Sequence, residues 1–382
     1  MLKNNKIAGS CLALTIFALS NQSVHAFEFK AGDTDVNISG YVKLDAIYDV
    51  DADIGDFAIL PRVGLDGSNV AEGHSNLHAR QSRIRLSTRT PTSDDTLVTV
   101  FEWDMYGGES NSPQPRLRHA YGSWNGVLAG QTWTNFISDR ALGQMRKVNF
   151  LPEPGANPGR QAQLRYTAGA FSVALEDPLN VGRGVVSGPS GLPAKAGLPD
   201  VTARYQSKVG SLNYAVAGLV RELSVDNGTV DDSATGWGVN LEGALAVGTN
   251  VTLRGTVKYG DGIGGYIESS PGATGAYVDP ANNSLELIEQ FGASASVAVK
   301  AGPGAVNIGH AFASADMDDA VSAGAVQANI ANEKYQSTHV NYIWSPTSRV
   351  TYGVEVGYHT RKVQSGLDGS ATRLQAMVQF GF

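Results

Sequence analysis

The chain has 382 residues, of which 42% are hydrophobic and 17% are charged, with 36 acidic residues against 29 basic ones. The acidic balance argues against nucleic acid as a partner, and the single cysteine, Cys11, excludes disulfide stapling. No segment approaches the roughly 18 uninterrupted apolar residues of a transmembrane helix, so a membrane-spanning form of this chain would be a β-barrel.

Residues 1–26 have the pattern of a signal peptide. Lys3 and Lys6 precede an apolar run, and Ala26 ends the stretch with a small residue suited to signal-peptidase cleavage. Without Lys3 and Lys6 the 29 basic residues become 27, so the formal net charge changes from −7 to −9. We therefore expect an exported mature chain, residues 27–382, that folds as one barrel domain.

The mature chain shows the period-two alternation of β-strands, each roughly 8 to 14 residues long. In the last predicted strand Leu374 and Val378 share one face while Arg373 and Gln375 share the other, as in a barrel wall between lipid and water. The predicted strands cover about 37–48, 80–90, 95–107, 116–124, 127–134, 160–168, 170–177, 200–207, 210–221, 235–247, 250–260, 285–300, 304–314, 333–344, 348–361 and 371–382.

The connections between these strands alternate between short and long. Short turns are rich in turn residues, as at Pro91–Asp94 and Asn125–Gly126. The long connections are expected at about 49–79, 108–115, 135–159, 178–199, 222–234, 261–284, 315–332 and 362–370. An even number of strands with both termini on the short-turn side is typical of bacterial outer-membrane barrels. The sequence therefore predicts an all-β fold, a 16-stranded antiparallel transmembrane β-barrel.

Several aromatic residues fall near the ends of predicted strands on the apolar face. This placement is typical of the aromatic girdles of membrane barrels, although cross-strand packing in a soluble sheet would also explain it. The residues are Tyr48, Tyr166, Tyr205, Trp237 and Trp344.

An acidic segment near the first predicted strand resembles a calcium loop at first sight. Asp49, Asp51, Asp53 and Asp56 have suitable spacing, but Ile54 stands where the loop requires glycine. A solvated acidic loop is the better interpretation.

Two histidine patterns have the residue types of metal or catalytic sites. His74 and His78 have ligand spacing only on a helix, and their surroundings are a poor helix. His119 and Ser123 share one face of a strand, but no acidic residue nearby would orient the histidine. We therefore predict no catalytic residue, no metal and no cofactor.

Basic residues recur on the polar face of the predicted strands and would line the lumen. The neighbouring acids Glu102 and Asp104 are expected to pair with some of them, and ordinary lumen lining neutralised by these acids is the alternative to an anion path. The basic residues are Lys43, Arg83, Arg85, Arg118, Arg165, Arg204, Arg254 and Arg373.

The connection from Thr134 to Gly159 mixes apolar and charged residues, unlike the other long connections. It occupies the position of a loop that folds into the lumen and narrows it. Arg140, Arg146 and Lys147 are therefore predicted to face the constriction.

Five segments in the first half of the chain resemble the DcaP-like outer-membrane porins. The resemblance implies a trimeric, sixteen-stranded channel that passes small anionic solutes, often dicarboxylates. The segments are Arg80–Arg83, Glu102–Asp104, Leu117–Gly122, Ala129–Thr134 and Leu164–Tyr166.

Together these observations predict a passive outer-membrane porin that prefers anions and has no enzymatic step. Its expected partners are small anionic solutes, outer-membrane lipid and lipopolysaccharide, and further copies of the chain in a homotrimer. The competing hypothesis is a secreted or periplasmic β-rich protein that binds or hydrolyses a ligand.

Overall fold

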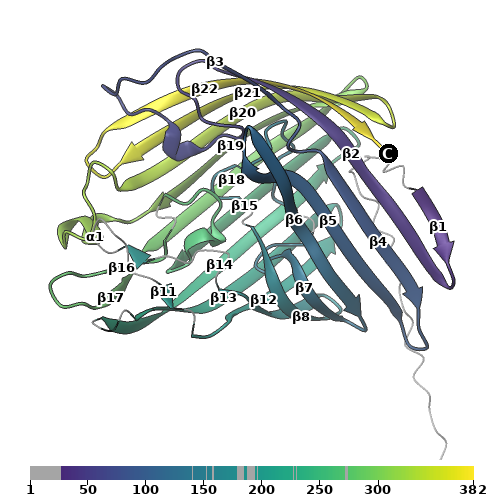
Figure 1. Cartoon of the computed structure of the whole chain (residues 1–382), viewed down its shortest axis with the longest axis horizontal. Coiled ribbons are helices and arrows are strands. Elements are labelled where there is room, and N and C mark those ends of the chain that lie inside the picture. The colour runs from purple at the N-terminus through teal and green to yellow at the C-terminus, as the bar shows by residue number, and fades with distance from the viewer. Residues whose placement is uncertain are drawn as a thin grey trace, which may run out of the picture.

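The computed structural model describes residues 27–139, 141–151, 153–156, 159–178, 185–186, 194–195, 197–226, 228, 230–271 and 274–382. Within these residues the chain forms a closed antiparallel barrel of 16 strands, which confirms the predicted fold class (Figure 1). The barrel strands are β2 (Thr34–Asp49), β4 (Arg83–Pro91), β5 (Thr96–Glu109), β6 (Ser112–Trp124), β7 (Val127–Trp133), β8 (Arg160–Ala168), β9 (Phe171–Glu176), β12 (Asp200–Val209), β13 (Leu212–Asp226), β14 (Asp231–Val247), β15 (Val251–Asp261), β18 (Glu289–Ala301), β19 (Gly304–Ala315), β20 (Asn332–Thr347), β21 (Val350–Val363) and β22 (Asp368–Gly381).

The barrel closes between its first and last strands. β2 pairs with β22 from Tyr41 opposite Gly381 to Asp49 opposite Arg373. The other edge of β2 is covered by β4 and, farther along, by β3 (His74–His78). Because every barrel strand is paired on both sides, the wall has no open edge for another chain to extend.

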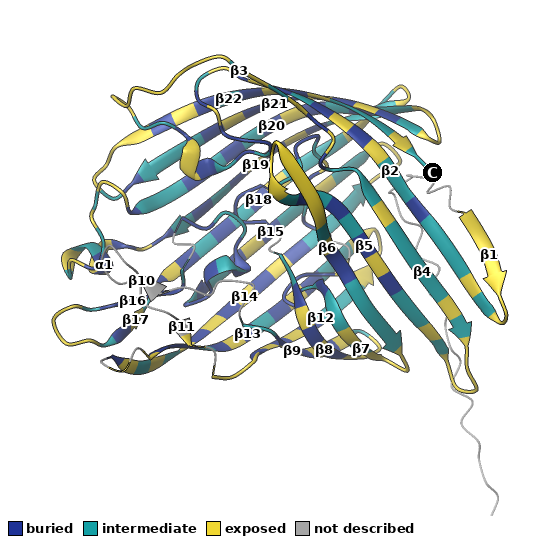
Figure 2. Cartoon of the chain, viewed as in Figure 1, coloured by how far each residue is buried: buried dark blue, intermediate teal, exposed yellow. Residues whose placement is uncertain are grey.

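The faces of the strands alternate as the sequence predicts. Val356 and Leu374 are 47% and 44% exposed on the outer face, whereas Arg373 and Gln375, on the inner face, are 2% and 5% exposed. Figure 2 shows this alternation as bands of exposed and buried residues along β2, β14 and β22. An apolar outer face is what lipid requires of a barrel.

Turns on one side of the barrel match the predicted short connections. They comprise residues 92–95, 125–126, 169–170, 210–211, 248–250, 302–303 and 348–349. Gly126 and Gly169 have φ angles of 78° and 62°, which glycine adopts without steric cost in a tight hairpin.

Three of the predicted long connections are wrong in extent because the strands continue into them. β5 and β6 pair as far as Glu109 and Ser112, so the expected 108–115 loop is a hairpin tip. β13 and β14 pair as far as Asp226 and Asp231, and β21 and β22 pair to Lys362 and Asp368. In β13 the apolar residues Leu223 and Val225 lie on the buried face, opposite to the exposed Val216 and Val220, so the outward apolar pattern stops there. The extensions of β5, β6 and β22 are mostly polar and show no such pattern.

The structure also contains short elements that the periodicity did not predict. β1 pairs with the start of β2, and β10 and β16 pair in parallel in a small separate sheet. No helix among the described residues is long and apolar enough to cross a membrane. The elements are β1 (Phe27–Ala31), η1 (Leu60–Arg62), β10 (Val185–Val186), β11 (Ala194–Lys195), η2 (Gly264–Tyr266), β16 (Ala276–Val278), β17 (Leu285–Leu287) and α1 (Asp318–Ser322).

The connection between β7 and β8 folds into the barrel, as predicted, and is called the inward loop here. Phe136 is fully buried in an apolar cluster with Leu219, Ile263 and Tyr266. Wall carboxylates then hold its backbone, because Glu242 accepts hydrogen bonds from the N–H groups of Ser138 and Gly143.

Farther along the inward loop, Glu355 accepts hydrogen bonds from Val148 N at 2.9 Å and Asn149 N at 3.1 Å. Glu242 lies on β14 and Glu355 on β21. The inward loop therefore follows the inside of the wall from β14 to β21.

Asp56 links the long connection between β2 and β3 to the β5–β6 hairpin. Its carboxylate accepts hydrogen bonds from Arg80, from Ser110 Oγ at 2.8 Å and from Asn76 Nδ2 at 2.6 Å. Burial alone would raise the pKa of Asp56, but these hydrogen bonds outweigh burial and hold the pKa below its ordinary value.

Candidate functional site

Four arginines and two carboxylates form a cluster on the lumen face of β4, β5 and β6, called the arginine ladder here. Glu102 lies 3.0 Å from Arg85 Nη1, 2.7 Å from Arg118 Nε and 3.4 Å from Arg83 Nε. Asp104 lies 2.6 Å from Arg116 Nη2 and 2.9 Å from Arg118 Nη1. These six residues together carry a formal charge of +2.

A β-bulge explains how β6 delivers two basic side chains to this point. Glu102 pairs with His119 while the next residue, Trp103, pairs with Leu117, so Arg118 is the extra residue of the bulge. Arg118 and His119 are consequently both buried on the inner side, at 4% and 6% exposure, while Leu117 is exposed on the outer face.

Aromatic rings from the inward loop and β5 cover part of the arginine ladder. Phe150 packs against Tyr106 with ring centroids 4.2 Å apart. The guanidinium carbons of Arg116 and Arg118 lie 5.3 and 5.7 Å from the centre of the Phe150 ring. Cation–π contacts of this kind hold guanidinium groups without neutralising their charge.

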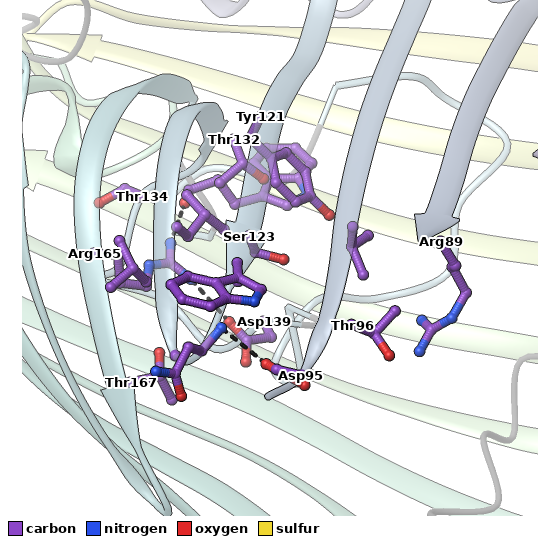
Figure 3. A pocket seen from close by; sticks show the side chains of 17 residues that line it. Arg89, Asp95, Thr96, Tyr121, Ser123, Thr132, Thr134, Asp139, Arg165 and Thr167 are labelled. Carbon is purple, nitrogen blue, oxygen red and sulfur yellow. Dashed lines mark hydrogen bonds and ion pairs between the residues drawn. The ribbon is translucent and has the colours of Figure 1, made fainter. Parts of the chain in front are cut away.

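A second pair of arginines shares a single carboxylate of the inward loop. Arg165 Nη1 and Arg204 Nη2 lie 3.1 and 2.7 Å from Asp139 Oδ1, and Arg204 also donates to the carbonyl oxygen of Ile137. Asp139 and Arg165 line a cavity of about 480 Å³ together with Tyr121 and side chains of the short turns (Figure 3). Arg165, Arg204 and Asp139 together carry a formal charge of +1.

A third pair has no carboxylate partner. Arg146 of the inward loop and Arg254 of β15 line one cavity with Lys300 of β18. Neither arginine side chain has a hydrogen bond or ion pair with another described residue, and no Asp or Glu lines the cavity.

The sequence matches the DcaP outer membrane protein family over residues 3–382. The chain belongs to the DcaP outer membrane protein family. No protein with a curated function matches it.

Solved structures agree with the family. The outer membrane channel DcaP of Acinetobacter baumannii is 25% identical, with a TM-score of 0.80 over 93% of this chain and 99% of that one. The anion-selective porin of Comamonas acidovorans is 12% identical, with a TM-score of 0.60 over 91% and 100%. The trimer form of OmpT from Vibrio cholerae is 13% identical, with a TM-score of 0.53 over 92% and 100%.

Family membership and the barrel place this protein among outer-membrane channels. This finding favours the porin hypothesis over the secreted binding or hydrolytic protein.

Three of the basic residues predicted to line the lumen are committed to structural contacts. Lys43 lies 2.9 Å from Asp45 and donates to the Val148 carbonyl of the inward loop at 3.0 Å. Arg373 is 2% exposed and forms a bidentate pair with Asp49 at 2.7 Å.

The third committed residue is Lys147, whose side chain is 4% exposed. It donates to the Leu151 carbonyl and lies 3.7 Å from Glu153 within the inward loop. Arg140, also predicted for the constriction, lies outside the described residues. The expected pairing of Glu102 and Asp104 with wall arginines is seen in the arginine ladder.

Sequence reasoning missed Glu242 and Glu355, which anchor the inward loop, and Lys300 at the third cation site. A usable signal was present, because both glutamates occupy inward positions of otherwise regular strands. A loop folded into a barrel needs acceptors for its backbone N–H groups, and inward glutamates supply them.

Proposed function

We propose that this protein is a passive channel for small hydrophilic solutes that favours anions, dicarboxylates among them, and has no catalytic step. The observation that carries the proposal is the surplus of guanidinium groups over carboxylates in the arginine ladder. The residues are Arg83, Arg85, Arg116 and Arg118 against Glu102 and Asp104.

The groups of the arginine ladder that are exposed to a permeating ion are the positively charged ones. The side chains of Glu102 and Asp104 are 6% and 0% exposed, because the guanidinium groups cover them. Arg85 and Arg116 are 37% and 35% exposed. A solute that reaches this wall therefore meets N–H donors rather than carboxylate oxygens.

The exposed guanidinium groups suit carboxylates in particular. Arg85 uses one Nη1–H in its contact with Glu102, which leaves further N–H donors for a solute. A guanidinium fork can hold both oxygens of a carboxylate, and one contact at 4 Å contributes about 4 kcal/mol at an effective dielectric near 20, before desolvation is subtracted. Several such sites in sequence allow an anion to move on without being trapped.

Among the predicted site residues, Arg83 and Arg85 are proposed to contact the permeating anion, and the buried Arg118, Arg165 and Arg204 to attract it through their charge. Arg116 is added to this set because it pairs with Asp104 beside Arg118. The description of the Comamonas acidovorans porin as anion-selective supports the same preference for a channel of this architecture.

The outer surface of the barrel indicates what surrounds the channel in the membrane. The apolar outer band is proposed to contact outer-membrane lipid, with lipopolysaccharide in the outer leaflet. The existence of a trimer form of OmpT supports a homotrimer. Export is proposed to remove residues 1–26, so N-terminal sequencing of the mature protein should begin at Phe27.

The double variant Arg85→Gln with Arg116→Gln tests the proposal, because it removes two exposed lumen charges and leaves the buried Arg118 in place. In proteoliposome swelling assays, succinate entry should fall relative to a neutral sugar, by about tenfold if each net contact contributes ~0.7 kcal/mol. Arg349→Gln, an exposed arginine at a short turn, is the matched control and should behave as wild type. An unchanged ratio of succinate to sugar entry in the double variant would contradict the proposed role of the ladder.

A further inference from the structure

Arg146, Arg254 and Lys300 line one cavity, and their side chains have no hydrogen bond, ion pair or cation–π contact with another described residue. The arginines of the ladder share Glu102 and Asp104, and Arg165 and Arg204 share Asp139. By contrast, no acidic residue lines the cavity between Arg146 and the wall.

The position of this cavity along the inward loop is informative. On one side of it Glu242 accepts the N–H groups of Ser138 and Gly143, and on the other side Glu355 accepts those of Val148 and Asn149. Between these two anchors the wall presents Arg254 and Lys300 instead of an acid. Between Ser138 and Asn149 the inward loop is thus held by a wall carboxylate on each side of this cavity, while no acidic residue lines the cavity itself.

Arg146 is held at this middle place by its own backbone. Its carbonyl oxygen accepts a hydrogen bond from Asn341 Nδ2 at 2.9 Å, and the preceding residue, Met145, is buried against the wall. The guanidinium group of Arg146 therefore remains near Arg254, close enough to act on it electrostatically. Two like charges fixed across a cavity repel one another unless an anion lies between them.

The cavity has a suitable size and lining for such an anion. Its volume is about 90 Å³, which is room for several waters and so for a phosphate-sized ion. Thr252 and Asn307 add polar groups to the three cationic side chains. Guanidinium and ammonium groups are the usual protein ligands of small oxyanions.

We propose that Arg146, Arg254 and Lys300 bind a small oxyanion, of the phosphate or carboxylate class, that bridges the inward loop to the barrel wall. The bound anion occupies the place that Glu242 and Glu355 fill at the neighbouring anchors. Its occupancy sets how firmly this stretch of the loop is held. The site does not depend on the pore preferring anions, because it concerns the attachment of the loop and not the solute that permeates.

Hydrogen exchange of the purified full-length protein in detergent, with inorganic phosphate as the probe, tests this bridge. Phosphate should slow exchange in peptides covering 141–151, compared with sodium chloride at equal ionic strength. At ten times the dissociation constant the slowing should be roughly tenfold where exchange proceeds through release of the loop.

Two substitutions of Arg254 distinguish an anion bridge at this cavity from a general stiffening of the protein by phosphate. Arg254→Gln should abolish the phosphate effect, whereas Arg254→Glu should pair with Arg146 directly and give slow exchange without phosphate. Arg349→Gln is the control and should keep the wild-type response. The proposal is overturned if phosphate has no effect on the wild type, if Arg254→Gln responds like the wild type, or if Arg254→Glu still requires phosphate. A cation-selective pore that retained the phosphate effect would overturn the proposed function and leave this site standing.

Discussion

Replacing Glu355 by Ala should release the inward loop from the β21 wall. Glu355 is 5% exposed and accepts hydrogen bonds from Val148 N at 2.9 Å, Asn149 N at 3.1 Å and Asn341 Nδ2 at 2.8 Å. Each of these is a hydrogen bond to a carboxylate, which contributes about 1.5–3 kcal/mol. Because lumen water can rehydrate the two backbone N–H groups, we take the lower figure for each and expect a loss of about 3 kcal/mol in loop attachment.

A loss of about 3 kcal/mol raises the population of the displaced loop roughly a hundredfold, since 1.4 kcal/mol corresponds to a factor of ten. Exchange of the amides near Val148 should accelerate by that factor in Glu355→Ala, and single-channel recordings should show added current fluctuations. Glu355→Gln keeps one acceptor oxygen and should lie between the variant and the wild type. Glu333→Ala, which removes a partly exposed partner of Lys362, is the control. Wild-type exchange at Val148 in Glu355→Ala would refute the assignment of Glu355 as a loop anchor.

Three further outcomes follow from the described structure. Val356→Arg, on the outer face, should cost about 2–4 kcal/mol in folding titrations, whereas Gln379→Arg, on the inner face, should cost much less; equal costs would contradict the assignment of the faces. The depressed pKa of Asp56 means that its contribution to holding the loop between β2 and β3 is complete above the unfolded pKa, near 4, and is lost as pH falls through the lower folded value. Wild-type loop protection from exchange should therefore persist at pH 5, while Asp56→Asn should lack it at all pH values, and loss of wild-type protection at pH 6 would refute the reasoning. An epitope at Gly324 should be accessible on intact cells and one at Lys208 should not, and the reverse would invert the orientation.

Sequence reasoning predicted the barrel because lipid imposes a local rule on each strand. Val356 and Leu374 had to be apolar and their neighbours polar, and that alternation can be read without knowing which strands pair. The rule ends where the wall leaves the membrane. It therefore missed the paired extension of β5 and β6 to Glu109 and Ser112.

The candidate site was only partly predictable, because parity tells which face a side chain occupies and not what lies opposite it. Lys43 and Arg254 read alike in the sequence, yet Lys43 is bound to Asp45 and the inward loop while Arg254 has no acidic partner among the described residues. The contact of Glu355 with Val148 joins residues 207 positions apart. Pairings of that kind depend on how the chain closes, which a single sequence does not display.

The central claim is that near contacts with lumen arginines outweigh the net negative charge of the chain. Acidic residues outnumber basic ones by 36 to 29, but charges in the external loops are screened by salt beyond ~8 to 10 Å, whereas a permeating ion meets Arg85 and Arg116 directly.

The most direct measurement of this claim is the reversal potential of the wild-type pore in a planar bilayer under a potassium chloride gradient. We expect a potential whose sign reports chloride as the more permeant ion. A potential of the opposite sign, reporting potassium selectivity, would contradict it while leaving the barrel and its family unaffected.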